Sequence, residues 1–142
     1  MSRSVAVPRA LAYTPFVGRD AVAAGLVTRA QLAGPAYLRL LPDIYVWAQL
    51  RLDHQARCVA TGLVLRDRGA VSGRAAAALR GADVLVRDEP IEVTVPTRTR
   101  LRTANGLTVV RSPLPARDVR RWAGIPVTTP RRTAFDLARR LR

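Results

Sequence analysis

The chain has 142 residues, of which 49% are hydrophobic, and its formal net charge is +14 at pH 7. This length suffices for one well-formed core or two very small ones, and a positive field of this size favours polyanions such as nucleic acid or acidic membrane surfaces. With one cysteine and one histidine, an intramolecular disulfide and a thiolate metal site are excluded, and no uncharged apolar run approaches the roughly 18 residues that cross a bilayer.

The first part of the chain predicts a lead-in and a short helix. Residues 1–15 carry two prolines and no clear hydrophobic period, so we expect an N-terminal arm. Between Phe16 and Val27 the apolar residues follow a helical spacing that ends at Gly25. This would be the first helix of a small unit over residues 16–50.

Residues 25–46 form the segment around which this unit is organised. Thr28 is a good N-cap for a short helix through Leu32, and Gly34 and Pro35 then break and restart the chain. Apolar anchors follow at Tyr37, Leu38 and Leu41, and the Pro42–Asp43 turn signal precedes a strand over Ile44–Trp47. Two short helices joined by a Gly-containing turn and followed by a strand are typical of a winged helix-turn-helix, which holds a helix at the DNA major groove.

Residues 51–142 predict a second, larger α+β domain. Asp53 can cap a helix in which Ala56, Val59, Ala60 and Leu63 form one apolar stripe. A second helix is expected from the N-cap candidate Ser72 through Ala75–Leu79 to Gly81.

The strands and the last helix of this domain follow. Residues 91–95 alternate as in a half-buried strand, residues 107–110 read as its partner after the Asn105–Gly106 turn, and a short strand is expected near residues 125–127. Thr129 and Pro130 then open a C-terminal helix. Its predicted apolar face comprises Ala134, Leu137, Ala138 and Leu141, and its predicted polar face Arg132, Asp136, Arg139 and Arg140. The fold class is therefore α+β: a small winged-helix-like N-terminal unit, then a mixed α/β domain with a short sheet and a C-terminal helix.

Arginines near the helix-turn-helix are candidate DNA contacts. Arg29, Gln31 and Arg39 flank the turn beside Thr28, where arginine can pair with guanine edges, glutamine with adenine, and all of them with phosphates. The alternative is that they are solvated residues of an Arg-rich protein, since all 24 basic residues are arginine.

A second basic region lies in the C-terminal third. Residues 98–142 hold 12 arginines and 2 acidic residues, whereas residues 1–97 hold 12 arginines and 8 acidic residues. Arg131 and Arg132 stand at a helix N-terminus, where free N–H groups attract anions. The pair is a candidate for phosphate, for an acidic protein surface, or for a solvated face.

The remaining reactive side chains predict neither catalysis nor a metal or cofactor. His54 and Cys58 are four residues apart on one helix, but two ligands do not make a metal site. Asp83, Asp88 and Glu92 resemble nuclease carboxylates superficially, yet Thr94 stands where such a nuclease needs lysine. Glu92 reads instead as the exposed residue of an alternating strand.

Four segments occur in one order across residues 16–141: GLVTRAQL, LPDIYV, SGRAAAALRGADV, and IEVTVP followed by IPVTTPRRTAFDLA. This pattern resembles the AbiE-type abortive-infection antitoxins, the regulators of type IV toxin-antitoxin pairs, in their high-GC bacterial form. It is also similar to the N-terminal region of proteins that continue into a very-short-patch-repair-like endonuclease domain. Ala75 stands where such proteins often have a second serine.

The resemblance implies a winged helix-turn-helix that binds double-stranded promoter DNA, and a second domain that counteracts a nucleotidyltransferase toxin encoded nearby, as a functional rather than tightly bound partner. Beside the resemblance, the residues themselves predict a cytoplasmic protein, because Arg3 and Arg9 are not followed by a continuous apolar secretory signal. They also predict no catalysis, because there is no paired general base and no phosphate-binding glycine loop. The alternatives are the non-catalytic N-terminal part of an endonuclease, or a protein-protein module for an acidic partner.

Overall fold

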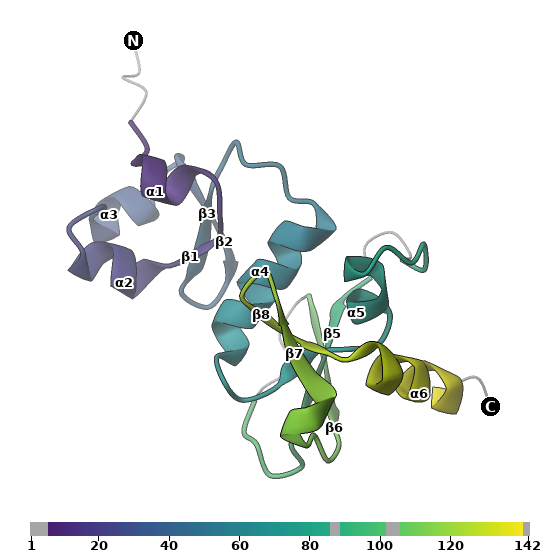
Figure 1. Ribbon diagram of the computed structural model, residues 1–142. Coiled ribbons are helices and arrows are strands. Elements are labelled where there is room, and N and C mark those ends of the chain that lie inside the picture. The colour runs from purple at the N-terminus through teal and green to yellow at the C-terminus, as the bar shows by residue number, and fades with distance from the viewer. Residues whose placement is uncertain (1–5, 86–88, 102–105, 141–142) are drawn as a thin grey trace. The chain divides into compact units, whose positions relative to one another are not determined.

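The computed structural model describes residues 6–85, 89–101 and 106–140. The chain divides into two compact units, residues 1–64 and 65–142, and both combine helices with a β-sheet (Figure 1). The predicted α+β class is confirmed.

Unit 1 places three short helices on a small antiparallel sheet. Its elements are α1 (Arg9–Ala12), β1 (Phe16–Val17), α2 (Gly18–Ala23), α3 (Arg29–Leu32), β2 (Tyr37–Leu41), β3 (Ile44–Trp47) and α4 (His54–Leu65). The sheet has the order β1-β3-β2, with β3 antiparallel to both neighbours.

An apolar cluster beneath these helices forms the core of unit 1. Tyr37 is 5% exposed and meets the Phe16 ring edge-on, with 5.8 Å between the ring centroids. Its predicted role as a core anchor is confirmed. Leu11 of α1 joins the same cluster at 3% exposure, so this part of the segment predicted as an arm is packed.

Two elements of unit 1 differ from the prediction. Phe16 and Val17 form β1, and the helix begins only at Gly18. Residues 37–41, predicted as anchors of the helical segment, are strand β2 instead, paired with β3 through a register shift between Arg39 and Leu41. The strand form follows from this pairing, because a short apolar run takes its conformation from its tertiary partner.

Helix α4 begins as predicted. The Asp53 carboxylate accepts a hydrogen bond from the Ala56 N–H at 2.8 Å, as an N-cap should. Its most buried residues are Cys58, Thr61 and Leu65, at 0%, 1% and 0% exposure, rather than the whole of the predicted stripe. Thr61 is accommodated because its hydroxyl donates to the Arg57 carbonyl at 2.9 Å.

Unit 2 contains a mixed five-stranded sheet with two helices. Its elements are β4 (Ala70–Val71), α5 (Gly73–Leu79), β5 (Ile91–Val95), β6 (Leu107–Arg111), the 3-10 turn η1 (Ala116–Asp118), β7 (Val119–Trp122), β8 (Ile125–Thr128) and α6 (Pro130–Arg140). The strand order is β6-β5-β4-β8-β7. Helix α5 contacts β5, β8 and α6.

The three strands predicted for this domain are present as β5, β6 and β8, but β5 and β6 pair in a different direction from the one predicted. β5 and β6 are parallel neighbours, so the expected hairpin through Asn105 and Gly106 is wrong. Asn105 itself lies outside the described residues. Strand β5 is also buried on both faces rather than half-buried. It is an inner strand between β4 and β6, and α5 contacts it.

Helix α6 starts at the predicted cap but buries two residues of its predicted polar face, Arg132 and Asp136. The Thr129 hydroxyl accepts from the Arg132 N–H at 3.2 Å, which confirms the N-cap. Arg132, Thr133 and Asp136 are buried, whereas Ala134 and Ala138 are exposed. These polar side chains can be buried because they are hydrogen-bonded to one another and to other parts of unit 2, as described below.

Candidate functional site

The turn between α2 and α3 is fixed by local backbone chemistry. Gly25 adopts a φ of +73°, which glycine takes without strain. At the start of α3 the Thr28 hydroxyl accepts from the Gln31 N–H at 3.1 Å, and the Gln31 side-chain oxygen accepts from the Thr28 N–H at 2.9 Å. Thr28 and Gln31, both predicted DNA contacts, therefore form a capping box.

Asp43 ties the β2–β3 turn to both helices. Its carboxylate accepts from the Arg19 N–H at 3.3 Å, and its carbonyl accepts from the Gly18 N–H at 2.8 Å. The same carboxylate lies 3.5 Å from Arg29 Nη1. Asp43 packs closely against the start of α2, so that a Cβ added at Gly18 would lie 2.7 Å from Asp43 Oδ1. Asp43 thus holds the start of α2 against the hairpin, and its contact with α3 is a weaker, exposed ion pair.

The two arginines predicted beside the turn come from different elements of unit 1. Arg29 is the first residue of α3, and its side chain is 62% exposed despite the contact with Asp43. Arg39 is exposed on β2, opposite Tyr45 in the register. Because α3 and β2 contact each other, both cations belong to the same small unit.

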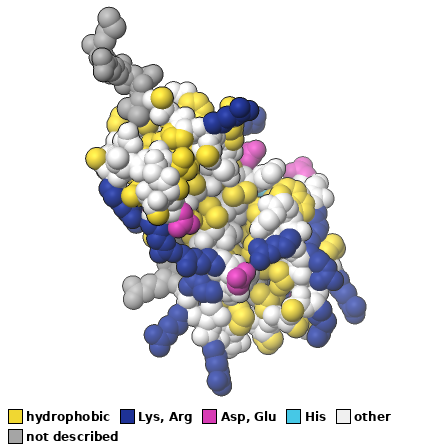
Figure 2. All heavy atoms as spheres, turned by 60° about the vertical axis from the view of Figure 1, so that its left-hand side comes forward, with side chains coloured by type: hydrophobic (Ala, Val, Ile, Leu, Met, Phe, Trp, Pro, Cys, Tyr) yellow, Lys and Arg dark blue, Asp and Glu magenta, His cyan; other side chains and the backbone are white. Residues whose placement is uncertain are grey.

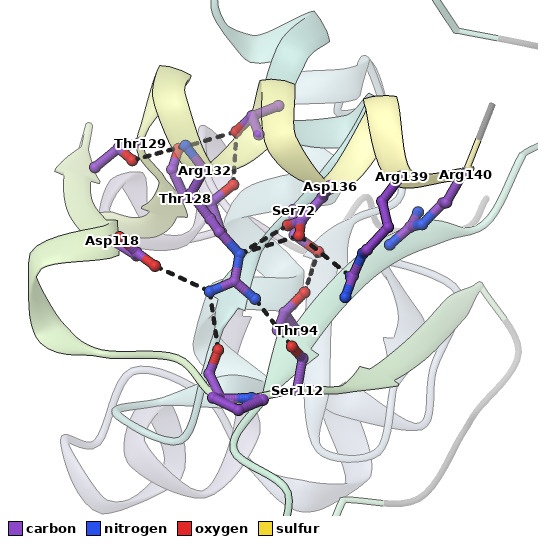
Figure 3. Close-up of polar contacts among 12 residues, drawn as sticks. Ser72, Thr94, Ser112, Asp118, Thr128, Thr129, Arg132, Asp136, Arg139 and Arg140 are labelled. Carbon is purple, nitrogen blue, oxygen red and sulfur yellow. Dashed lines mark hydrogen bonds and ion pairs between the residues drawn. The ribbon is translucent and has the colours of Figure 1, made fainter. Parts of the chain in front are cut away.

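Arg132 is the centre of a buried polar cluster in unit 2 (Figure 3). Its Nε donates to Asp136 at 3.0 Å, its Nη1 to Asp118 at 3.0 Å and to the Pro113 carbonyl at 2.8 Å, and its Nη2 to Ser112 at 3.1 Å. The side chain is 8% exposed. Burial lowers the pKa of Arg132, but its hydrogen bonds to Asp118 and Asp136 outweigh that effect and raise the pKa.

This geometry separates the two adjacent arginines of α6. Arg132 fastens α6 to η1 and to the segment after β6, so its donors are directed into the unit rather than toward a phosphate. Arg131 is exposed. The sequence could not distinguish the two, because the carboxylates that hold Arg132 include one 14 residues earlier in the chain.

A second polar cluster joins α5, β5 and α6. The Ser72 hydroxyl donates to Glu92 at 2.7 Å and accepts from the Thr94 hydroxyl at 2.7 Å. Arg140 pairs with the same Glu92 carboxylate, its Nη2 lying 3.0 Å from Oε2. The Glu92 side chain is only 13% exposed, so the prediction of an exposed strand residue is wrong.

Gly73 makes room for that carboxylate. Its φ is +59°, and a Cβ there would lie 2.6 Å from Glu92 Cδ. Sequence reasoning identified Ser72 as a helix cap, but its side chain makes no capping bond and binds Glu92 instead. The sequence did carry a signal for this cluster. Ser72 and Gly73 stand just before a helix, and Glu92 and Thr94 lie two residues apart on a strand.

A groove of about 800 Å³ lies beside this second cluster. Two ion pairs stand in its wall, Arg74 with Glu89 at 3.5 Å and Arg140 with Glu92. Its apolar lining includes Val84, Leu85 and Leu137. A groove with apolar patches and paired charges is suited to binding.

Cys58 and His54 of α4 lie outside these clusters. Cys58 is fully buried, its Sγ lies 3.4 Å from His54 Nε2, and burial raises its pKa to about 12. At neutral pH the thiol is therefore protonated and a poor nucleophile or ligand. In the part of the chain that the structure describes, no three side chains of His, Cys, Asp or Glu gather in a way suited to a metal ion.

Of the helices within residues 6–85, 89–101 and 106–140, none combines the length and the apolar character that a membrane span requires.

A family model of known proteins matches the later part of the chain. Residues 49–142 fit the model of a family described as the AbiEi antitoxin C-terminal domain. This range includes α4 and all of unit 2. No curated protein matches the chain.

Proposed function

The chain belongs to the AbiEi antitoxin family, and on this premise we propose that it is a DNA-binding transcriptional regulator of a type IV toxin-antitoxin pair. The resemblance to AbiE-type antitoxins noted in the sequence is confirmed by this membership, which also implies a toxin as partner. Beyond the family membership, we propose that the chain binds DNA, that it regulates transcription, and that the toxin is a nucleotidyltransferase.

The topology of unit 1 carries the proposal. Its order of helix, strand, two helices and a hairpin, with the sheet order β1-β3-β2, is typical of winged helix-turn-helix domains. In that arrangement α2 and α3 are the helix-turn-helix pair, α3 enters the major groove, and the β2–β3 hairpin is the wing.

The contacts follow from this assignment. Arg29 opens α3 and Arg39 lies on the first strand of the wing, so we assign both to the DNA, with base or phosphate as target. Arg29 is free to exchange Asp43 for DNA, because an exposed pair at 3.5 Å contributes at most about 1 kcal/mol. Arg131 is assigned to phosphate, while Thr28 and Gln31 preserve the shape of α3.

The first test is binding of the purified chain to its own upstream DNA and to scrambled DNA of equal length, at two salt concentrations. We expect tighter binding to the upstream DNA, with log affinity falling steeply as log salt rises. Equal binding to both DNAs, or none to either, would overturn the regulator assignment.

A variant test then examines the contacts. Arg29→Ala with Arg39→Ala should weaken binding to the upstream DNA more than to scrambled DNA. Arg131→Ala should weaken both alike and reduce the salt slope by about 1. Arg98→Ala removes the same charge from an exposed loop and is the matched control. Equal losses from the Arg29 and Arg39 pair on both DNAs would exclude a recognition role.

A further inference from the structure

A hollow of about 380 Å³ lies at one end of the sheet of unit 2, where β5 ends and β4 and β8 begin. Its apolar lining comes from Pro96 after β5, Leu114 and Ala116 around η1, Val119 of β7 and Pro126 of β8. Pockets of this size and character receive the rings of small ligands.

The charged residues around this lining are mainly cationic, with Arg68, Arg120 and Arg121 against Asp67. Backbone carbonyls orient all three guanidinium groups. Arg68 donates to two carbonyls at 3.2 Å each, Arg120 to the carbonyl of the preceding residue at 3.0 Å, and Arg121 to the carbonyl of Gly124 at 3.1 Å. A carbonyl carries no net charge, so these bonds orient the cations without neutralising them.

Asp67 offsets little of this charge. Its carboxylate accepts from Arg121 Nη2 at 3.1 Å, but the Asp67 side chain is 91% exposed and the Arg121 side chain 62%. An ion pair so open to water is weak and screened by salt, and Arg121 can exchange it for another anion. The hollow therefore combines an apolar lining with a rim that attracts anions.

We propose that this hollow binds one nucleotide of a single-stranded nucleic acid, with its base against the apolar lining and the adjoining phosphates on Arg120 and Arg121. Bases of a single strand can leave the stack, and proteins receive them on apolar side chains and on the planar face of arginine. The inference goes beyond the regulator assignment and does not depend on it, because it uses neither α3 nor the β2–β3 hairpin.

Shape and chemistry favour a single strand over other anions. A duplex keeps its bases paired and stacked, so it offers phosphates to the arginines but no base to the hollow. A free phosphate leaves the apolar lining in water. An acidic peptide offers carboxylates, whereas a nucleotide adds a flat aromatic ring that fits the lining and stacks on a guanidinium group.

The test measures binding of the intact chain to labelled oligonucleotides of one scrambled sequence by fluorescence anisotropy. The probes are a single-stranded RNA, the corresponding single-stranded DNA, the duplex of that DNA, and an abasic single strand of equal length. We expect the abasic strand to bind about tenfold more weakly than the strands that carry bases. A preference for RNA would assign part of the binding to the ribose 2′-hydroxyl, and equal binding of RNA and DNA would assign it to base and phosphate; both support the proposal.

Arg121→Ala should raise the Kd for the single strands about tenfold, but that for the duplex no more than about twofold, because only a single strand places a base beside this residue. Arg121→Lys should raise the single-strand Kd about fivefold, because lysine keeps the charge but lacks the planar group. Arg139→Ala is the matched control, since Arg139 is also an exposed arginine of unit 2 with one carboxylate partner but does not line the hollow. It should leave the Kd unchanged, and all three variants should keep the thermal unfolding of the parent chain.

Equal losses on single strand and duplex in Arg121→Ala, or equal binding of the abasic strand, would make the hollow a general phosphate surface and overturn the proposal. Absence of single-strand binding would also overturn it. So would displacement of the RNA by an oligoglutamate of equal charge at equal concentration, which would indicate an acidic protein as partner.

The outcomes for this site and for the regulator assignment are separable. If single-strand binding depends on Arg121 while the chain ignores its upstream DNA, the hollow stands and the regulator assignment fails. If the upstream DNA is bound specifically while Arg121→Ala leaves single-strand binding unchanged, the regulator assignment stands and the hollow is not a nucleotide site.

Discussion

At the scale of single residues, the side chains with most influence on the candidate sites are those that hold other groups in place. Gly73 is one, because its missing Cβ leaves room for the Glu92 carboxylate, which in turn joins Ser72 of the α5 cap to Arg140 of α6. Asp43 has the same role in unit 1, where one carboxylate contacts the start of α2 and the start of α3. Neither residue needs to touch a ligand to affect binding.

Gly73→Ala tests this role. The new Cβ meets Glu92 in a backbone conformation that alanine disfavours by about 1–2 kcal/mol, and displacing the bonded carboxylate should add about 1–3 kcal/mol. Urea unfolding measures the sum. Gly81→Ala is the control, because Gly81 also has a positive φ but no atom within 4 Å of the added Cβ. Equal losses in the two variants would mean that Glu92 moves aside freely.

At the scale of elements, the most buried side chains of α6 attach it through polar contacts, while Leu137 is half-buried. Arg132 bonds to η1, to the segment after β6 and to its own helix, and Thr133 adds a contact of 2.7 Å with Thr128 of β8. Such clusters specify one orientation of a helix, because each donor fits only one set of acceptors. That orientation is what leaves Phe135 on the surface.

Arg132→Ala should therefore lower the free energy of unfolding by about 3–5 kcal/mol, because it leaves the Asp136 carboxylate buried without its main partner. Urea unfolding followed by circular dichroism measures the loss. Arg131→Ala, at the exposed neighbouring position, should change stability by no more than about 0.5 kcal/mol. Similar small effects for both would show that the cluster does not hold the helix.

At the scale of the whole molecule, the dominant feature is an excess of arginine. On the face drawn in Figure 2 the arginine side chains project separately and outnumber the acidic groups. A net charge of +14 repels itself in the compact state, while exposed ion pairs such as Arg121 with Asp67 contribute little. The fold therefore tolerates a charge that suits a polyanionic or acidic partner.

Raising NaCl from low to moderate concentration should accordingly stabilise the free chain, by about 2–4 °C in melting temperature, because salt screens the repulsion. Differential scanning fluorimetry at constant pH measures this, with an uncharged osmolyte at equal osmolality as the control for solvent effects. A melting temperature that falls with salt would mean that attractive pairs outweigh the net repulsion.

The sequence by itself determined the features that depend on neighbours along the chain. The caps at Thr28, Asp53 and Thr129 were predictable, because each bonds the N–H three residues later. Strand β5 was visible from its alternation, and the family from the order of its segments. Strands β4 and β7 were not predicted, because one has two residues and the other is Val-Arg-Arg-Trp, without an apolar period.

Tertiary structure alone decided which face of α6 is buried, that β5 and β6 run parallel, and that Glu92 is enclosed. Hydrophobic periodicity assumes that apolar residues turn inward. It fails for Arg132 because Asp118, from a distant segment, and Asp136 of the same helix bond the buried guanidinium. Arg132 reaches Asp118 and Ser112 across 14 and 20 residues of chain, so these contacts exist only in the folded unit. The exposure of Phe135 follows from that long-range pairing.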